Sequence, residues 1–359
     1  MEKLRVGIVG CGGIANGKHM PSLSKVSECE MVAFCDIIEE KAVAAAQKYG
    51  VPGAKVCTDY MEIANDPTID VVHVCTPNRS HSFISIACLK AGKHVMCEKP
   101  MAKTAAEAKA MLDAAKESGK KLTIGYQNRQ VLNQQILKKA ADAGKLGEIY
   151  FAKAHAIRRR AVPTWGVFMN EYEQGGGPLI DIGTHALDLT LWTMNNYEPY
   201  MVVGSSFRKL ADTKNAANAW GPWDPEKFTV EDSAFGFIKM KNGATIILES
   251  SWALNITDTA EACVTVCGTK GGATTKGALV FNGEEDGMLY THKPESTGGV
   301  AFYDGFSAND PSESEARQWI RSIINDTQPC VLPEQALVVS QILEAIYTSS
   351  KTGKPVYFD

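Results

Sequence analysis

Asp181 and His185 are the pair of side chains in this sequence best suited to proton chemistry. They follow three consecutive glycines and Pro178, and proline is tolerated in the first turn of a helix because its missing N–H would be unpaired there. In a helix that begins at this point, residues four apart share one face, so the carboxylate and the imidazole become neighbours. Such a histidine can accept or give a proton near neutral pH. The local pattern fits a buried structural ion pair equally well.

Lys99 is a second candidate for chemistry. It lies between Glu98 and Pro100, directly after an apolar stretch, residues 94–97, which we expect to be a strand. A stiff turn would hold its ammonium in place, where it could bind a substrate hydroxyl. The alternative is an exposed lysine that pairs with Glu98 and has no chemical role.

A glycine-rich motif near the start of the chain predicts a dinucleotide site. An apolar run, residues 4–9, leads into Gly10, Gly12, Gly13, Ile14 and Ala15, a G-x-G-x-x-A version of the dinucleotide fingerprint. The first glycine makes the tight turn, the second lets the backbone approach a pyrophosphate, and the alanine keeps the helix close to the strand. The phosphates are then expected at the start of the following helix.

Asp36 predicts which dinucleotide is bound. It ends a second apolar stretch, residues 31–35, where its carboxylate can accept both ribose hydroxyls. Ile37 and Ile38 follow it, and neither can hold a 2′-phosphate. Because the carboxylate would repel that phosphate, the sequence predicts NAD over NADP.

The first third of the chain alternates strands and helices, which predicts a doubly wound parallel sheet. Expected strands at 69–75, 94–97 and 122–125 are separated by expected helices at 81–91 and 104–118. Ligands of such sheets bind at the carboxyl ends of the strands. The side chains there that we expect to line a cofactor crevice are Thr76, Pro77, Asn78, Glu98, Lys99 and Gln127.

Composition narrows the functional class. The chain has 359 residues, 45% of them hydrophobic, with a net charge of −4, which predicts two domains and no nucleic-acid or membrane-surface partner. The ten cysteines form no C-x-x-C pair or Cys/His cluster, so we expect reduced thiols, no metal site and a cytoplasmic protein. No apolar run reaches about 18 residues, and the N-terminal run is too short for a signal peptide.

The ordered set of motifs resembles the Gfo/Idh/MocA family of sugar and cyclitol oxidoreductases. The resemblance rests on the glycine loop, on Thr76-Pro77-Asn78 with His81, on Glu98-Lys99-Pro100, and on the segment that ends at His185. It implies an N-terminal Rossmann domain, residues 1–125, and a C-terminal α/β domain, residues 126–359, built on an open, mostly antiparallel sheet. It also implies cofactor contacts that include His81.

The later pattern agrees with such a second domain. Residues 149–157, 201–207, 233–241, 244–252 and 262–267 are strand-like, and Asn242-Gly243 is a strong hairpin signal. A sheet with one uncovered face exposes apolar surface, so we expect a homo-oligomer formed through this sheet, and the resemblance implies a dimer or tetramer.

Two aromatic loops flank the Asp181 segment. Residues 158–174 predict a pocket wall in which Trp165 contacts the cofactor while Arg158 and Tyr172 contact substrate; a solvated loop is the alternative. Residues 215–228 carry Trp220 and Trp223. These tryptophans could stack on a sugar or its aglycone, or could cover a neighbouring subunit, and the sequence does not decide between the two.

The resemblance assigns the roles. It implies that Lys99, Asp181 and His185 are catalytic and touch substrate, with His185 taking the alcohol proton, Asp181 orienting the substrate and Lys99 polarising or relaying. The expected reaction is NAD-dependent oxidation of a secondary ring hydroxyl of a sugar, a glycoside (position C3 favoured) or an inositol. One alternative is a redox-neutral enzyme that cleaves glycosides or exchanges sugars with tightly bound NAD. Another is a non-catalytic dinucleotide-binding regulator.

Overall fold

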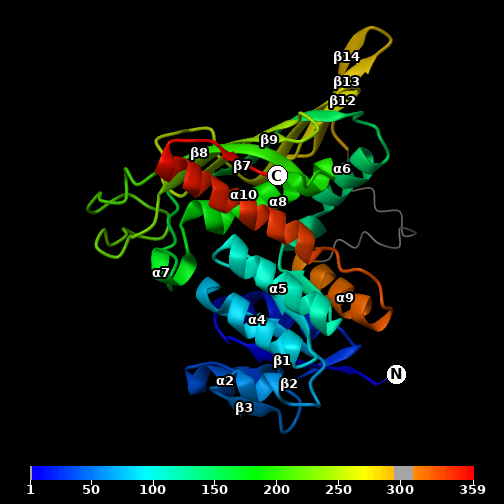
Figure 1. Cartoon of the computed structure of the whole chain (residues 1–359), viewed down its shortest axis with the longest axis vertical. Helices are drawn as coiled ribbons and strands as arrows, with labels where there is room; N and C mark the ends of the chain where they lie inside the picture. Colours follow the sequence, from blue (N-terminus) through cyan, green and yellow to red (C-terminus); the bar gives the residue numbers. More distant parts are fainter. Residues whose placement is uncertain (1, 295–309) are drawn as a thin grey trace. The chain divides into compact units, whose positions relative to one another are not determined.

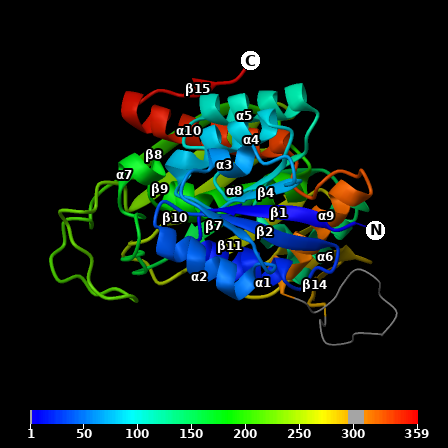
Figure 2. The same cartoon turned by 90° about the horizontal axis from the view of Figure 1, so that it is seen from below.

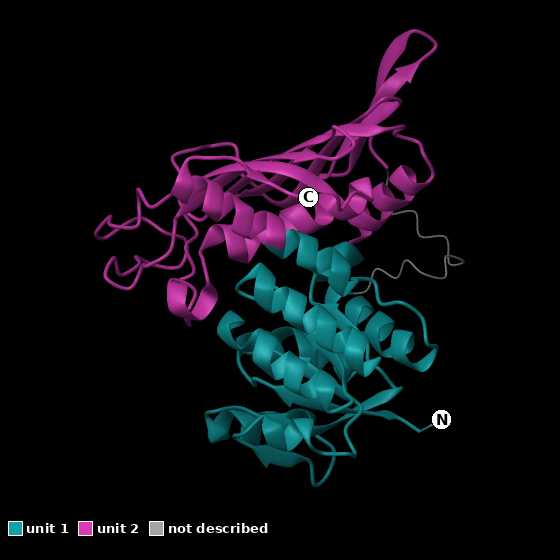
Figure 3. Ribbon diagram, viewed as in Figure 1, with its two compact units in different colours: residues 1–130, 309–340 teal, residues 131–308, 341–359 magenta. Residues whose placement is uncertain are grey.

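A computed structural model describes residues 2–294 and 310–359 of the chain. The chain forms two compact units (Figure 1). The first contains residues 1–130 and 309–340, and the second contains residues 131–308 and 341–359 (Figure 3). The division therefore differs from the single boundary after residue 125 that the sequence predicted, because a late stretch of chain packs into the first unit.

The first unit is built on a six-stranded parallel sheet in the order β3-β2-β1-β4-β5-β6, which confirms the predicted doubly wound fold. The order reverses between β1 and β4, the point at which such sheets bind dinucleotides. The strands are β1 (Leu4–Val9), β2 (Cys29–Cys35), β3 (Lys55–Cys57), β4 (Val71–Val74), β5 (His94–Cys97) and β6 (Leu122–Ile124).

Helices cover both faces of this sheet. Figure 2 shows α2 (Glu39–Tyr49) on one side, and α4 (His81–Lys90) and α5 (Ala105–Ser118) on the other. The start of α5 is fixed by Thr104, whose side chain accepts the backbone N–H of Glu107 at 3.2 Å, an ordinary N-cap. The same unit has two shorter helices, α1 (Met20–Leu23) and α3 (Met61–Ala64).

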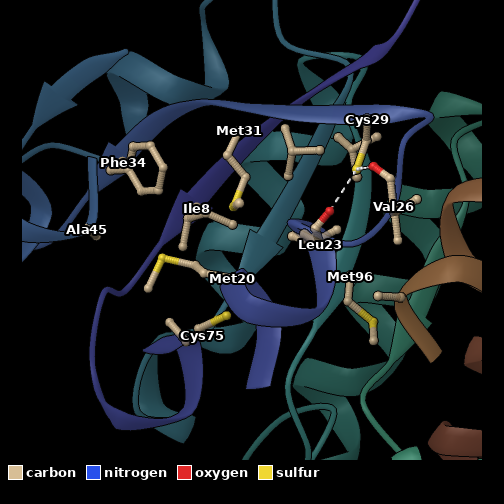
Figure 4. Packing of buried hydrophobic residues seen from close by; sticks show 14 of the residues in the cluster. Ile8, Met20, Leu23, Val26, Cys29, Met31, Phe34, Ala45, Cys75 and Met96 are labelled. Atoms are coloured by element: carbon tan, nitrogen blue, oxygen red, sulfur yellow. Dashed lines mark hydrogen bonds between the residues drawn. The ribbon is translucent and has the colours of Figure 1, made fainter. Parts of the chain in front are cut away.

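The core of the first unit explains why its boundary is discontinuous. Figure 4 shows part of a cluster in which Ile8, Met20 and Phe34 are fully buried. Helix α9 (Pro311–Ile324) adds Trp319 and Ile320 to the same cluster. The hydrophobic side of this late helix therefore completes the nucleotide-binding unit, and the following helix α10 (Pro333–Thr352) begins in the first unit and ends in the second.

The second unit is built on a nine-stranded sheet in the order β14-β13-β12-β11-β7-β10-β9-β8-β15. Every neighbouring pair is antiparallel except β7 and β10, as the predicted mostly antiparallel sheet requires. The strands are β7 (Ile149–Ile157), β8 (Pro199–Phe207), β9 (Ser233–Met240), β10 (Thr245–Ser251), β11 (Ala260–Gly268), β12 (Gly271–Thr274), β13 (Val280–Glu285), β14 (Met288–His292) and β15 (Val356–Tyr357).

The two faces of this sheet differ. One face buries Val202, Ile238 and Leu248, and helix α8 (Thr184–Met194) packs against β7 and β11 there. The other face leaves Val203, Phe207 and Phe237 between 38% and 40% exposed. The remaining helices of this unit are α6 (Leu132–Asp142) and α7 (Glu171–Gln174). Among the helices of the described residues, none is long and apolar enough to cross a membrane.

Candidate active site

The glycine loop has the backbone that a dinucleotide needs. Gly10 has φ +90°, and a Cβ there would lie 2.8 Å from the carbonyl of Cys75, so only glycine fits. A Cβ on Gly12 or Gly13 would meet no heavy atom within 4 Å, and Ile14 is 41% exposed. The loop is therefore closed on the strand side and open on the other, which leaves its backbone accessible to a pyrophosphate.

Asp36 lies against this loop. Its Oδ2 accepts the backbone N–H of Cys11 at 2.8 Å, and its Oδ1 accepts that of Ile38 at 2.9 Å. The next side chain, Ile37, is 90% exposed and carries no charge. A carboxylate fixed at the end of β2 without an adjacent cation fits the unphosphorylated ribose of NAD.

The other predicted cofactor residues follow strands of the same parallel sheet. Thr76, Pro77 and Asn78 come after β4, Lys99 after β5 and Gln127 after β6, and all are at least partly exposed. Because the strands are parallel, these residues share one edge with the glycine loop. This set therefore fits a dinucleotide laid across the carboxyl ends of the strands.

His81 lies between two backbone carbonyl groups of the first unit. It is fully buried, with Nδ1 2.7 Å from the carbonyl oxygen of Pro100 and Nε2 2.9 Å from that of Thr76. Burial lowers the pKa of this imidazole. His81 therefore links the loop after β4 to the Lys99–Pro100 turn, whose peptide bond is cis, and its predicted cofactor contact stays a prediction.

Glu98 is also buried, and its carboxylate is held by groups of the first unit. Its Oε1 accepts hydrogen bonds from Lys18 Nζ and His19 Nε2, each at 2.7 Å, and its Oε2 accepts the backbone N–H of Lys99 at 3.1 Å. Burial opposes the charge of this carboxylate, but Lys18 and His19 outweigh burial and hold its pKa well below the usual range. Glu98 thus fixes the turn that carries Lys99, and its predicted cofactor contact stays a prediction.

The partners of Glu98 form a buried charged cluster that the sequence did not reveal. Lys18 also pairs with Glu315 of α9 at 2.9 Å, and His19 Nδ1 lies 3.0 Å from His73 Nδ1. Burial, with His19 and Lys18 nearby, holds the pKa of His73 well below its usual range, so this ring is neutral. The one available signal was Lys18-His19, two polar residues in the helical turn after the glycine motif.

Asp181 and His185 lie in the second unit, on the helical segment that the sequence predicted. A π-helical turn, Leu179–Gly183, runs directly into α8, so the first turn is wider than an α-helix. Asp181 Oδ2 accepts the indole N–H of Trp252 at 3.1 Å, and the guanidinium of Arg158 lies 4.0 Å from the same oxygen. The carboxylate is partly exposed, while His185 is 9% exposed.

Trp252 was not predicted as a site residue. It directly follows β10 and is fully buried, so only its N–H marks it as more than a core residue. From the sequence alone, a tryptophan that follows a strand is interpreted as a core residue. The hydrogen bond to Asp181 becomes visible only when β10 and the π-helical turn are placed together.

The glycines before Asp181 are held by a half-buried carboxylate. Glu231 Oε2 accepts the N–H of Gly177 at 2.9 Å, and its Oε1 accepts the N–H of Leu179 at 3.1 Å and the hydroxyl of Tyr347 at 2.8 Å. A side chain on Gly176 would collide with the Tyr347 hydroxyl, and one on Gly177 with the backbone of Glu231. Burial raises the pKa of Glu231 to about 7.

The predicted pocket-wall residues all lie in the second unit. Arg158 forms two hydrogen bonds of 2.6 Å to Glu261, Trp165 packs against Trp220, and Tyr172 is 66% exposed on α7. The cofactor contact of Trp165 and the substrate contact of Tyr172 remain predictions. Among the described residues, no group of three or more His, Cys, Asp or Glu side chains is arranged to hold a metal ion.

Comparison with known families identifies the chain. The family model described as the Gfo/Idh/MocA oxidoreductase family, NAD-binding Rossmann fold, matches residues 4–126, and the model of the same family's C-terminal alpha/beta domain matches residues 138–358. The chain belongs to the Gfo/Idh/MocA oxidoreductase family. This membership confirms the predicted resemblance, the class of enzyme and NAD as the cofactor.

Individual Gfo/Idh/MocA proteins are similar to the chain over most of its length. The D-glucoside 3-dehydrogenase of Escherichia coli is 38% identical over 98% of this chain and 97% of its own. The myo-inositol 2-dehydrogenase of Thermotoga maritima is 30% identical over 69% of this chain and 68% of its own. An oxidoreductase domain protein from Kribbella flavida has the same fold, with a TM-score of 0.86 over both whole chains at 24% identity.

Proposed function

We propose that this protein oxidises a secondary ring hydroxyl of a sugar or cyclitol with NAD, and that a glycoside oxidised at C3 is the favoured substrate. The observation that carries the proposal is Asp181, a partly exposed carboxylate held by Trp252 and Arg158 one helical turn before His185. The 38% identical D-glucoside 3-dehydrogenase, matched along almost its whole length, supports the choice of a glycoside.

NAD would be held by the glycine loop and Asp36, and the chemistry that it supplies when bound is the acceptance of a hydride. We assign the proton of the substrate hydroxyl to His185, because an imidazole is the side chain that most often acts as a general base. Asp181, positioned by Trp252 and Arg158, would accept a hydrogen bond from a neighbouring ring hydroxyl. Lys99 would donate to the reacting oxygen from a turn that Glu98 and His81 hold in place.

A panel of glycosides, free sugars and inositols tests the reaction. Incubated with NAD, the protein should produce NADH, followed by absorbance, with at least one pyranoside or inositol. His185→Ala should lower kcat about 100-fold or more, since general acid–base catalysis contributes about that much. His292→Ala on the exposed strand β14 is the matched control and should keep wild-type activity.

Three results would contradict parts of this proposal. No NADH with any member of the panel rules out the simple dehydrogenase, and NAD that stays bound through purification while a glycoside is consumed favours the redox-neutral alternative. Full activity of His185→Ala refutes the assignment of the base. NAD binding without turnover of any sugar would favour a regulator.

We also propose that two copies associate through the exposed face of the second unit's sheet. Phe207 and Phe235 lie 6.1 Å apart on this face, and Phe237 is 40% exposed beside them, which leaves apolar surface in contact with water. Light scattering at micromolar concentration should give at least a dimer, and Phe237→Glu should shift it toward monomer. The ten free thiols suit a reducing compartment, so we place the protein in the cytoplasm.

A further inference from the structure

Two loops of the second unit, residues 158–170 and 208–232, are joined side by side. The side chain of Asn218 accepts the N–H of Val162 at 2.8 Å and donates to its carbonyl at 3.0 Å. Three more hydrogen bonds continue the pairing, from Ala219 N to Arg160 O, from Thr164 Oγ1 to Trp220 O, and from Thr229 N to Met169 O. Neither loop has regular secondary structure, yet together they form one bonded layer.

Buried aromatic rings fix this layer to the Asp181 segment. Trp223 is 3% exposed and donates its indole N–H to the carbonyl of Ala211 at 2.8 Å. Its ring lies 5.9 Å from that of Phe228, which lies 6.3 Å from Trp252, the indole that holds Asp181. The two loops are therefore anchored beside the proposed catalytic carboxylate.

The outer side of the layer presents a pair of tryptophans. The rings of Trp165 and Trp220 meet edge to face, with centroids 4.8 Å apart and planes at 85°. Trp165 is 50% exposed and Trp220 is 45% exposed, although Trp223 of the same loop is buried. Two large apolar rings of this layer are thus half exposed to solvent.

Arg158 connects this pair to Asp181. Its guanidinium lies 5.5 Å from the centre of the Trp220 ring, a cation–π distance, and 4.0 Å from Asp181 Oδ2. Two hydrogen bonds of 2.6 Å to Glu261 fix its orientation. Asp181, Arg158, Trp220 and Trp165 therefore form one continuous surface that starts at the proposed catalytic carboxylate and ends in exposed aromatic rings.

We propose that Trp165 and Trp220 form a binding subsite for the aglycone of a glycoside, and that the preferred aglycone has a flat apolar face. The inference rests on the proposed function, since it assigns the sugar ring to Asp181 and the group across the glycosidic bond to the tryptophans. Aromatic rings stack well on flat apolar groups, whereas a methyl aglycone is too small to reach them.

The alternative occupant, a second copy of the chain, fits this pair less well. A stable protein interface buries about 800 Å² on each partner, far more than two half-exposed indoles provide. The sheet face with Phe207 and Phe237 offers a broader apolar surface for that purpose. The tryptophan pair is therefore better matched in size to a small aromatic ligand than to a protein surface.

The test compares phenyl and methyl glucosides of the same anomer, oxidised with NAD by the full-length protein. The measured quantity is the ratio of kcat/KM for phenyl glucoside to kcat/KM for methyl glucoside. Trp220→Ala should lower this ratio about 10-fold, the upper end of what one aromatic pair contributes. Trp220→Phe, which keeps a ring, should retain most of it. Tyr357→Ala, which removes an aromatic side chain that is 62% exposed on β15, is the control.

Trp165→Ala supplies a second variant in case Trp220→Ala does not fold. If Trp165 also contacts the cofactor, its loss lowers both kcat/KM values together, so that only a subsite role lowers the ratio. An unchanged ratio in both variants, with wild-type protein active on both glucosides, overturns the subsite and leaves the proposed function intact. Wild-type protein that oxidises neither glucoside overturns the glycoside assignment, and the subsite with it.

Discussion

Glu231 accepts a hydrogen bond from the phenolic hydroxyl of Tyr347 at 2.8 Å, and the same carboxylate holds the backbone of Gly177 and Leu179. The segment that carries Asp181 therefore begins at a half-buried carboxylate that accepts hydrogen bonds from three donors. All three donors favour the ionised form, whereas burial favours the protonated form and prevails, raising the pKa of Glu231 to about 7.

This balance predicts a pH-dependent stability. The pKa of Glu231 is higher in the folded chain than its ordinary value of 4.5, so between pH 4.5 and 7 the folded state binds more protons than the unfolded state. The contribution of Glu231 to the free energy of unfolding therefore falls as pH rises through this window. Urea unfolding at pH 5, 6 and 7 measures this free energy. It should fall less steeply with rising pH in Glu231→Gln than in the wild-type protein. Parallel curves for the two proteins would contradict the assignment.

The indole N–H of Trp252 is predicted to position Asp181. Trp252→Phe removes the donor and keeps an aromatic ring, so kcat should fall about 10-fold, the effect of one lost hydrogen bond of about 1.4 kcal/mol. Trp319→Phe is a matched control in the first unit, because Trp319 is also fully buried but its indole N–H has no hydrogen-bond partner among the described residues. Equal loss of kcat in both variants would show a packing effect only.

His81 is predicted to couple stability to NAD binding. A neutral imidazole donates from one nitrogen only, so it hydrogen-bonds one of the two carbonyls, of Thr76 or of Pro100, and only lies close to the other. His81→Phe removes the ring N–H, leaves that carbonyl without its donor and should lower the free energy of unfolding by about 2 kcal/mol. Because these loops carry Asn78 and Lys99, the Kd for NAD should rise as well. An unchanged Kd would confine His81 to a purely structural role.

Asp36 is predicted to set the preference for NAD. Its carboxylate is fixed by Cys11 N and Ile38 N, so a 2′-phosphate would meet a negative charge that cannot turn away. Replacing Asp36 by Ser and Ile37 by Arg should weaken NAD binding and strengthen NADP binding, each measured by titration. Wild-type protein that binds NADP as tightly as NAD would refute the role of this charge.

Regular, half-buried elements were predictable from the sequence. The strand expected at 94–97 is β5 and that at 149–157 is β7, because their apolar residues follow the spacing of buried strands. Strands β13 and β14 were missed for the opposite reason. They form a hairpin that extends from the end of the sheet (Figure 1), where Met288 and Leu289 are 71% and 89% exposed, so burial imposes no pattern.

The site was predictable where one local motif defines it. Gly10 needs positive φ and Asp36 ends a strand, and both features can be read within a few residues. The contacts of Glu98 with Lys18 and His19 were not predictable, because these partners come from about eighty positions earlier in the chain. Trp252 and Glu231 were missed for the same reason, since each acts on the Asp181 segment across a large sequence separation.

Helix α9 has a consequence for how the protein is made. Ribosomes release the chain from its N-terminus, and domains generally fold as they emerge. Here the sheet of the first unit is complete at β6, yet Trp319, Ile320 and the Lys18 partner Glu315 emerge only after most of the second unit. Until α9 emerges, the first unit leaves exposed the apolar surface that Trp319 and Ile320 cover, and Lys18 lacks its partner Glu315. The nucleotide-binding unit thus starts to form before the second unit but cannot be completed until α9 has been made.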